Sequence, residues 1–207
     1  MFTFYYAPKT CALASHIALE EAGADYRAVR LDFGKTEQQS PEYLKLNPKG
    51  RVPALVTPQG VLTETPAILT FVAQSFPGAR LAPFDDPFAF AELQAFNSYL
   101  CSTLHVAHAH GRRGARWADE PSSIADMQRK VPQTVGACFE LVENNLLRGP
   151  WVMGTAYTIA DPYLFTVAQW LEGDGVDLKR VPRVVEHRAR MAERPGVKKV
   201  LAAESLA

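Results

Sequence analysis

A single cysteine near the start of the chain, Cys11, has a position that favours reactive chemistry. Residues 2–6 read as a short strand, residues 8–10 as a turn, and the following residues as a helix whose first turn contains Cys11. Unpaired backbone amides and the helix dipole favour an anion at such a junction, and Lys9 adds a positive charge. We therefore expect a stabilised thiolate at Cys11, with Thr10 capping the helix. The alternative is a small buried residue in a turn, the commoner fate of a lone cysteine.

A second junction places a hydroxyl group at another helix start. Glu64 and Thr65 directly precede Pro66, and this order predicts Thr65 as the N-cap and Pro66 as the first helical residue. Proline is tolerated there because its missing amide would have no partner in the helix. The sequence therefore predicts a helix that begins at this point.

Polar side chains also lie on the helix predicted over residues 87–110. Ser98 and His105 are seven residues apart, nearly two turns, so we expect them on one side of the helix. A lone histidine on a helix is more often structural, and His108 and His110 compete with His105 for any role. The periodicity alone leaves the choice among the three open.

Two other groups of side chains also leave alternatives open. Tyr5 and Tyr6 are adjacent on a strand and point to opposite faces, so we interpret both mainly as packing residues. The helix end beyond the histidines carries a basic cluster with one aromatic residue: Arg112, Arg113, Arg116 and Trp117. This cluster either lines a ligand pocket, where it can cradle an acidic substrate, or forms a solvated helix end.

Composition indicates an ordinary globular protein. The 207 residues are 47% hydrophobic, which suits one large or two small domains, and 22 basic residues balance 22 acidic ones. This balance argues against nucleic acid or an anionic membrane as the main partner. No signal-peptide pattern or membrane-spanning apolar run is found, so we expect a cytoplasmic protein. Three distant cysteines, Cys11, Cys101 and Cys138, indicate neither a disulfide framework nor a zinc site.

The first 78 residues predict an α/β unit. The first strand, the helix after Cys11 and a second strand over residues 26–32 form a βαβ unit, which favours a parallel pair. Gly23 provides the stop of that helix. Residues 33–41 are polar and read as loop. The later predicted elements are a short helix over 41–46, a strand over 54–57, its hairpin partner over 61–63 and a helix over 66–76.

Beyond residue 77 the chain predicts only helices. Residues 83–87 are rich in proline and acid and read as a linker. The predicted helices cover residues 87–110, 122–147, 181–193 and 197–203, with one more that starts at residues 158–161. Pro132 should kink the second of these. Residues 158–161, Thr-Ile-Ala-Asp, resemble a capping box with aspartate in the usual glutamate position.

Several short motifs follow one another in a specific order along the whole chain. They are Tyr6-Ala7-Pro8 with Cys11, His16-Ile17-Ala18-Leu19, NPKGRVPAL over 47–55, Leu62-Thr63-Glu64, Ser102-Thr103-Leu104-His105, TIADPYLF over 158–165 and MAERP over 191–195. With these motifs the chain resembles the cytosolic glutathione transferases, most closely the bacterial beta class. The resemblance implies an α/β thioredoxin-like N-terminal domain over residues 1–78 that binds glutathione. It also implies an all-α C-terminal helical domain over residues 86–207 that contributes the electrophile site.

The resemblance also assigns roles to named residues. It implies that Cys11 and His105 are catalytic, with the imidazole pointing into the site near the cysteine and the glutathione sulfur. Val52, before a cis Pro53, would pair with the cysteinyl backbone of glutathione as an added strand does. The implied contacts to the γ-glutamyl end and to the rest of glutathione are Glu64, Thr65, Lys35, Ser98 and Ser102.

The chain departs from the family pattern near these residues. Asparagine is usual where Ser98 aligns, although Asn97 is adjacent and can substitute for it if the helix is slightly rotated. Lysine commonly follows the histidine, but Val106 stands here, which removes a cation near the thiolate. Glycine or serine is common at the position of Thr65. These changes bear on glutathione affinity and on thiolate activation, whereas the fold is unaffected.

The resemblance implies a glutathione transferase that activates the glutathione thiol for attack on a small, mostly apolar electrophile, a reaction of detoxification. Glutathione is then the co-substrate, no metal is needed, and a homodimer without nucleic-acid or membrane partners is expected. One alternative is a glutathione-dependent thioltransferase, dehalogenase or isomerase of the same fold. The other is a non-catalytic interaction module, against which the retained cysteine, acidic helix start and histidine argue.

Overall fold

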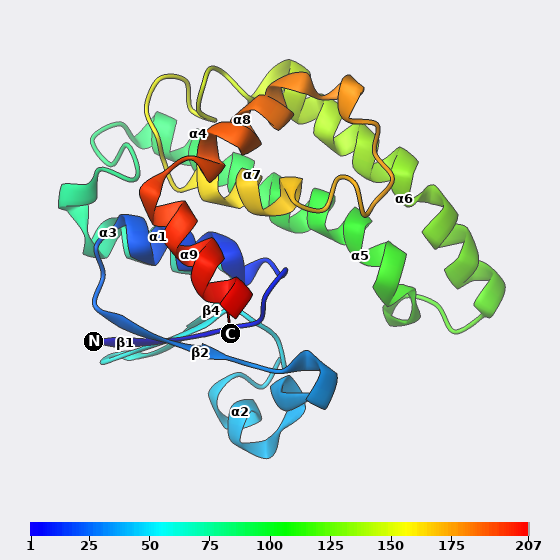
Figure 1. Ribbon diagram of the computed structural model, residues 1–207, viewed down its shortest axis with the longest axis horizontal. Helices are drawn as coiled ribbons and strands as arrows, with labels where there is room; N and C mark the ends of the chain where they lie inside the picture. The colour runs from blue at the N-terminus through cyan, green and yellow to red at the C-terminus, as the bar shows by residue number, and fades with distance from the viewer. Residues whose placement is uncertain (207) are drawn as a thin grey trace.

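Four strands form one mixed sheet in the first half of the chain (Figure 1). The computed structural model describes residues 1–206, with side chains through Ser205. In sequence order, the first half contains β1 (Phe2–Tyr6), α1 (Ala12–Glu21), β2 (Tyr26–Arg30), α2 (Pro41–Leu46), β3 (Ala54–Thr57), β4 (Gly60–Thr63) and α3 (Thr65–Ser75). The order of strands across the sheet is β2-β1-β3-β4, so β1, which leads to Cys11, is an inner strand.

The predicted βαβ unit is confirmed. β1 pairs with β2 in parallel, with Phe2 beside Tyr26 at one end and Tyr6 beside Arg30 at the other. β3 runs antiparallel to both β1 and β4, as expected for the hairpin. The region predicted as loop contains two single 3₁₀ turns over residues 33–35 and 37–39. The first half therefore has the thioredoxin-like α/β fold that the sequence predicts.

The second half consists of helices. They are α4 (Pro87–Tyr99), α5 (His105–Arg113), α6 (Pro121–Leu141), α7 (Ala160–Ala168), α8 (Pro182–Ala192) and α9 (Pro195–Leu206). A π-helical segment, Leu100–Leu104, joins α4 to α5, and α6 continues through Pro132 into a second π-helical segment, Val142–Leu146. Beyond residue 86, strand-type pairing within the described chain is limited to one bridge between Trp151 and Gly154. The predicted all-α second half is confirmed.

No helix within residues 1–206 is both long and apolar enough to cross a membrane.

α1 is the element at which the two halves meet. Every residue from Ala12 to Leu19 is buried, because α1 contacts β1 and α3 on one side and α7 and α9 on the other (Figure 1). A helix that is apolar on all sides is typical of such complete burial. The main hydrophobic core runs continuously from Phe4 on β1 to Val184 on α8. Cys11, directly before α1, is therefore held by a helix that is anchored in both halves.

One buried and one partly buried polar contact fix α9 and the residue before it to α1. The Nδ1 atom of His16 lies 2.8 Å from the Glu204 carboxylate, and both side chains are buried. At the other end of α1, the Arg194 guanidinium donates through Nε to Glu21 at 3.0 Å. The C-terminal helix therefore returns to the helix that begins beside Cys11.

The capping box at the start of α7 is confirmed in its main contact. The buried Asp161 carboxylate accepts hydrogen bonds from the Thr158 amide at 2.7 Å and from the Val152 amide at 2.8 Å. His187 Nε2 lies 3.0 Å from the same carboxylate. The Thr158 hydroxyl accepts from the Ala160 amide at 3.3 Å. Asp161 thus joins the start of α7, the loop before it and α8.

Candidate functional site

A cleft of about 330 Å³ opens between the two halves beside the start of α1. The first half lines it with Lys9, Thr10, Cys11, Arg51, Val52, Pro53, Glu64 and Thr65. The second half lines it with Cys101, His105, His108, Arg113, Arg116, Trp117, Tyr163 and Trp170. The fold therefore brings six of the predicted site residues together at one cleft: Cys11, Val52, Pro53, Glu64, Thr65 and His105.

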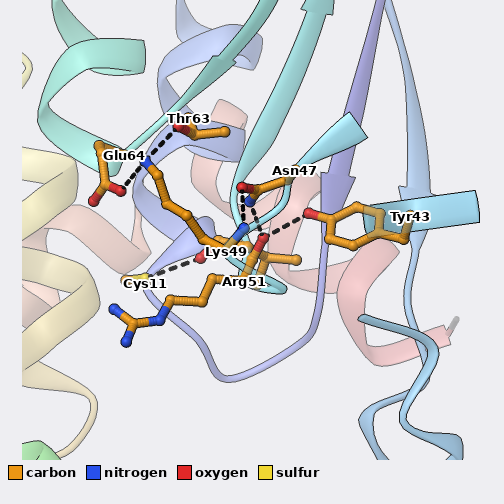
Figure 2. A network of polar contacts seen from close by, with 8 residues as sticks. Cys11, Tyr43, Asn47, Lys49, Arg51, Thr63 and Glu64 are labelled. Carbon is orange, nitrogen blue, oxygen red and sulfur yellow. Dashed lines mark hydrogen bonds and ion pairs between the residues drawn. The ribbon is translucent and has the colours of Figure 1, made fainter. Parts of the chain in front are cut away.

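The Cys11 thiol lies on the wall formed by the first half. Its Sγ donates a weak hydrogen bond to the Val52 carbonyl oxygen at 3.6 Å (Figure 2). Burial raises the pKa of the Cys11 thiol, and a hydrogen bond from Thr65 and the charge of Arg113 only partly oppose this. The expectation of a stabilised thiolate is therefore wrong. The thiolate loses more stability through lost hydration than it gains from the N-terminus of α1.

Both helix starts at the cleft lie one residue from their predicted positions. Cys11 itself is the N-cap of α1, and the Thr10 hydroxyl accepts from the Ala12 amide at 3.3 Å, so Thr10 still satisfies the first turn. Glu64 is the N-cap of α3, and Thr65 is its first helical residue. The prediction of Thr65 as the cap is therefore wrong by one position. The amide of Thr65 belongs to the first turn, where helix amides have no backbone partner.

Glu64 has a backbone φ of 74°, which non-glycine residues seldom adopt and which costs roughly 1 to 3 kcal/mol. Its carboxylate accepts from Lys49 Nζ at 2.5 Å, and the same amine donates to the Thr63 hydroxyl at 2.8 Å (Figure 2). Both members of this pair are about half exposed, so the pair adds only about 0–1 kcal/mol. An incoming ammonium group can therefore compete with Lys49 for Glu64. Nothing in the local sequence indicates this contact.

The Val52–Pro53 peptide bond is cis, as the resemblance implies. Side chains of the preceding segment hold this loop, because the Arg51 carbonyl accepts from the Tyr43 hydroxyl at 2.6 Å and from Asn47 Nδ2 at 2.7 Å (Figure 2). The side chain of Val52 is buried, with 8% of its surface exposed. Val52 therefore offers the cleft its backbone groups and little of its side chain.

Ser98 and His105 do not lie on one side of a helix, so that expectation is wrong. The π-helical segment Leu100–Leu104 holds more residues per turn than an α-helix, and it therefore rotates α4 relative to α5. Ser98 is exposed, whereas the neighbouring Asn97 is fully buried. Neither residue lines the cleft.

Lys35 and Ser102 also lie outside the cleft lining. Lys35 Nζ is 3.7 Å from Asp32, and its side chain is 75% exposed. The exposed Ser102 hydroxyl donates to the Ser98 carbonyl at 2.8 Å. Contact of Lys35, Ser98 and Ser102 with glutathione therefore stays a prediction.

His105 projects into the cleft from the first turn of α5. Burial, followed by the charges of His108 and Arg113, lowers its pKa to about 4. The imidazole is therefore neutral near pH 7, where it can donate a hydrogen bond from one ring nitrogen but is a weak base. This environment favours the donor role over the base role.

His108 has the better geometry for proton transfer. Its Nδ1 atom lies 2.8 Å from both carboxylate oxygens of the buried Asp174, and its ring stacks on Trp170 with centroids 4.1 Å apart. The ring of His105 packs against the same Trp170 at 5.0 Å. A carboxylate on one ring nitrogen fixes the ring and leaves the other nitrogen for a further partner. The sequence indicates His108 as a competitor of His105, but it carries no local signal for Asp174 and Trp170, which lie far away along the chain.

The basic cluster divides between the two interpretations left open by the sequence. Arg113, Arg116 and Trp117 line the cleft, whereas Arg112 does not line it and is exposed. Trp117 is 47% exposed and meets the ring of His110 edge-on at 4.6 Å. Most of the cluster therefore belongs to the cleft, although it is open to solvent.

The remaining titratable groups in the cleft are a thiol and a phenol on the helical side. Burial raises the pKa of Cys101 and also that of Tyr163. Within the part of the chain that the structure describes, no group of three histidine, cysteine or acidic side chains is arranged to hold a metal ion. Tyr5 and Tyr6 do not line the cleft; Tyr6 is buried, and Tyr5 packs against Tyr43 at 5.5 Å, as a packing role requires.

Comparison with known proteins agrees with this geometry. Residues 1–74 match the sequence model of the glutathione S-transferase N-terminal domain, and residues 114–204 match that of the glutathione S-transferase C-terminal domain. Glutathione S-transferase GstA of Escherichia coli O157:H7 is 34% identical over 205 residues, which cover 98% of each chain.

Solved structures extend the similarity to three dimensions. A glutathione transferase homologue from Sulfitobacter, crystallised with bound glutathione, has a TM-score of 0.95 and 48% identity over 98% of each chain. The bacterial beta class glutathione S-transferase of Sphingomonas chungbukensis has a TM-score of 0.85 and 32% identity, covering 99% of this chain and 100% of its own. Both halves of the chain and their arrangement therefore match these structures.

Proposed function

This chain belongs to the glutathione S-transferase family and is a glutathione transferase, and from that premise we propose how its residues divide the work. Residues 1–78 hold glutathione, and residues 86–207 supply the site for the electrophile. The observation that carries this division is the single wall on which Cys11, the cis Val52–Pro53 step and the start of α3 lie together.

Glutathione lies along the wall of the first half. The γ-glutamyl carboxylate meets the unpaired amide of Thr65 at the N-terminus of α3, and the ammonium group meets Glu64. The cysteinyl backbone pairs with Val52. The loop that contains Val52 is held by the hydrogen bonds from Tyr43 and Asn47 to the Arg51 carbonyl. These three contacts direct the sulfur toward Cys11.

Two hydrogen-bond donors then stabilise the sulfur of glutathione as an anion. The raised pKa of Cys11 keeps its thiol protonated, so it donates a hydrogen bond and does not compete as a thiolate. The neutral imidazole of His105 donates from the opposite wall. Each donor to a charged group contributes about 1.5–3 kcal/mol. His108, held by Asp174, is the imidazole that can take up the thiol proton.

The electrophile binds against the helical half, where Trp117 provides exposed aromatic surface. We further propose a homodimer in a cytoplasmic location, which rests on the membership of the family. Sedimentation of the purified protein tests the dimer: a monomer at micromolar concentration would exclude it.

Thr65→Val tests the proposed glutathione site, with Thr70→Val on the same helix as the matched control outside the cleft. Calorimetry should show the Kd for glutathione rising about tenfold in Thr65→Val, because the Thr65 hydroxyl, which we propose binds the γ-glutamyl carboxylate beside the backbone amide, is lost while the amide remains. The control should bind as the wild type does. Equal affinity in both variants would place glutathione elsewhere.

A further inference from the structure

The cleft carries an excess of positive charge that the proposed function does not use. Lys9, Arg51, Arg113 and Arg116 line it, whereas Glu64 is its single acidic lining residue within the described chain. This local excess occurs on a protein whose 22 basic and 22 acidic residues cancel. The cleft therefore attracts anions although the protein as a whole is neutral.

The arginines of the cleft also lack carboxylate partners. Six other arginines, among them Arg148 and Arg188, form ion pairs with glutamate or aspartate side chains. Within residues 1–206, Arg51, Arg113 and Arg116 form no such pair. Arg51, Arg113 and Arg116 line the same cleft, and burial and the charges of Arg113 and Arg51 lower the pKa of Arg116. Like charges gathered in this way favour an anion that neutralises them.

The fold holds two of these arginines on one rigid turn. Arg113 ends α5, Arg116 ends the 3₁₀ turn Gly114–Arg116 that follows, and both residues line the cleft. The turn packs closely on α6, because a Cβ atom on Gly114 would lie only 3.0 Å from Ile124 Cγ2. The guanidinium pair is thus presented by a fixed element and not by a loose loop.

The arginine pair faces the reacting groups from the electrophile side. Arg113 lines the cleft together with Cys11 and His105, and its charge lowers the pKa of both groups. Arg51, by contrast, lies on the glutathione wall next to Val52, where a carboxylate of glutathione can use it. Arg113 and Arg116 therefore remain for the second substrate.

Resting on the proposed function, we propose that Arg113 and Arg116 form a carboxylate-binding subsite and that the electrophile is a planar anion. Paired guanidinium groups match a carboxylate with parallel hydrogen bonds. Trp117 lines the same side, is 47% exposed and offers a flat surface to a conjugated or aromatic body. This assignment replaces the mostly apolar electrophile expected from the sequence with an acidic one.

Two probes of nearly equal shape test the subsite: 4-chloro-3-nitrobenzoate and its neutral amide, 4-chloro-3-nitrobenzamide. With either probe, the sulfur of glutathione bonds to the ring carbon that bears chlorine. The carbon–chlorine bond breaks, chloride leaves with the electron pair, and the thiol proton passes to solvent. The readout is the ratio of kcat/KM for the benzoate to that for the amide, each corrected for its rate without enzyme.

We expect the double variant R113Q/R116Q to lower this ratio about ten- to a hundredfold, because charged hydrogen bonds to one probe are lost. The variant R113K/R116K should recover part of the ratio, because lysine keeps the positive charge but not the planar guanidinium group. R112Q, a matched change on the exposed neighbour outside the cleft, should leave the ratio as in the wild type. A ratio that moves less than about twofold in R113Q/R116Q overturns the proposal, since even one such hydrogen bond is worth more.

Glutathione affinity separates this inference from the function on which it rests. If the Kd for glutathione rises in R113Q/R116Q while the ratio stays constant, the arginines belong to glutathione and the subsite is disproved. If the wild type binds glutathione and conjugates the amide but shows no arginine-dependent preference, the subsite alone fails. If the wild type binds no glutathione, the proposed function fails first.

Discussion

The two walls of the cleft are built in different ways. The wall of the first half offers mainly backbone groups: the Val52 peptide, the first amides of α3 and the turn before α1. The helical wall offers side chains: two imidazoles, two guanidinium groups and two indoles. A backbone wall suits a substrate that is always the same, whereas a side-chain wall can change with each substitution. The comparison assigns glutathione recognition to the first wall and the choice of electrophile to the second.

Ion pairing also differs between the walls. On the first wall Glu64 pairs with Lys49 beside Arg51, which forms no ion pair within the described chain, whereas on the second wall neither Arg113 nor Arg116 has an acidic partner there. Burial raises the pKa of Cys11 on one side and lowers that of His105 on the other, so both groups are uncharged near neutrality. In the proposed function, the anion that forms between them is therefore the sulfur of glutathione.

The largest expected effect comes from the support behind the helical wall. Asp161→Ala leaves two backbone amides and His187 without their buried carboxylate and should lower the free energy of unfolding by about 3–5 kcal/mol. Asp126→Ala, which removes an exposed ion pair, should change it by less than about 1 kcal/mol. Urea unfolding measures both. Similar small losses in the two variants would show that α7 does not depend on this carboxylate.

Cys11 allows the first wall to be tested as a hydrogen-bond donor. In a Cys101→Ser background, which removes the other cleft thiol, Cys11→Ala should abolish thiol–disulfide exchange but lower kcat for conjugation only about tenfold, as the loss of one donor predicts. Cys11→Ser should recover conjugation and not exchange.

The same background tests the protonation state of Cys11. Alkylation of Cys11 should keep accelerating as pH rises through the ordinary thiol range, because burial raises its pKa. If the alkylation rate no longer increases with pH near neutrality, Cys11 is already a thiolate there, and this account is contradicted.

A smaller effect should appear in the pH dependence of stability on the helical wall. The folded pKa of His105 is about 4, below the value of about 6.5 in an unfolded chain, so the unfolded state binds more protons between these values. The free energy of unfolding should therefore fall as pH is lowered through this window. In the His105→Gln variant it should fall less. Urea unfolding at the two ends of the window gives the difference. An equal fall in both proteins would show that His105 is not buried among cations.

The sequence predicts the first wall better than the second. Strand alternation, Gly23 and the Pro66 signal locate the elements of the first half to within one or two residues, because each signal is local. The cis state of the Val52–Pro53 bond is known in advance only through the resemblance, since nothing local distinguishes it from a trans bond.

The second wall depends on features that have no local signal. The π-helical segment Leu100–Leu104 turns Ser98 away from His105, although the seven-residue spacing predicts one side. Asp174 and Trp170 meet His108 only through the tertiary fold. The pKa of Cys11 follows from burial by the other half, which a strand-to-helix junction does not reveal. Contacts between distant segments are therefore what sequence analysis misses.

A crystal structure of the protein with glutathione tests the central claim most directly. The account predicts the sulfur within about 4 Å of Cys11 Sγ and of a ring nitrogen of His105, as hydrogen bonds to sulfur require, with the γ-glutamyl carboxylate at the Thr65 amide. Glutathione bound with its sulfur directed away from both groups, or with its γ-glutamyl end on Arg113 and Arg116, would contradict the division of the cleft into two walls.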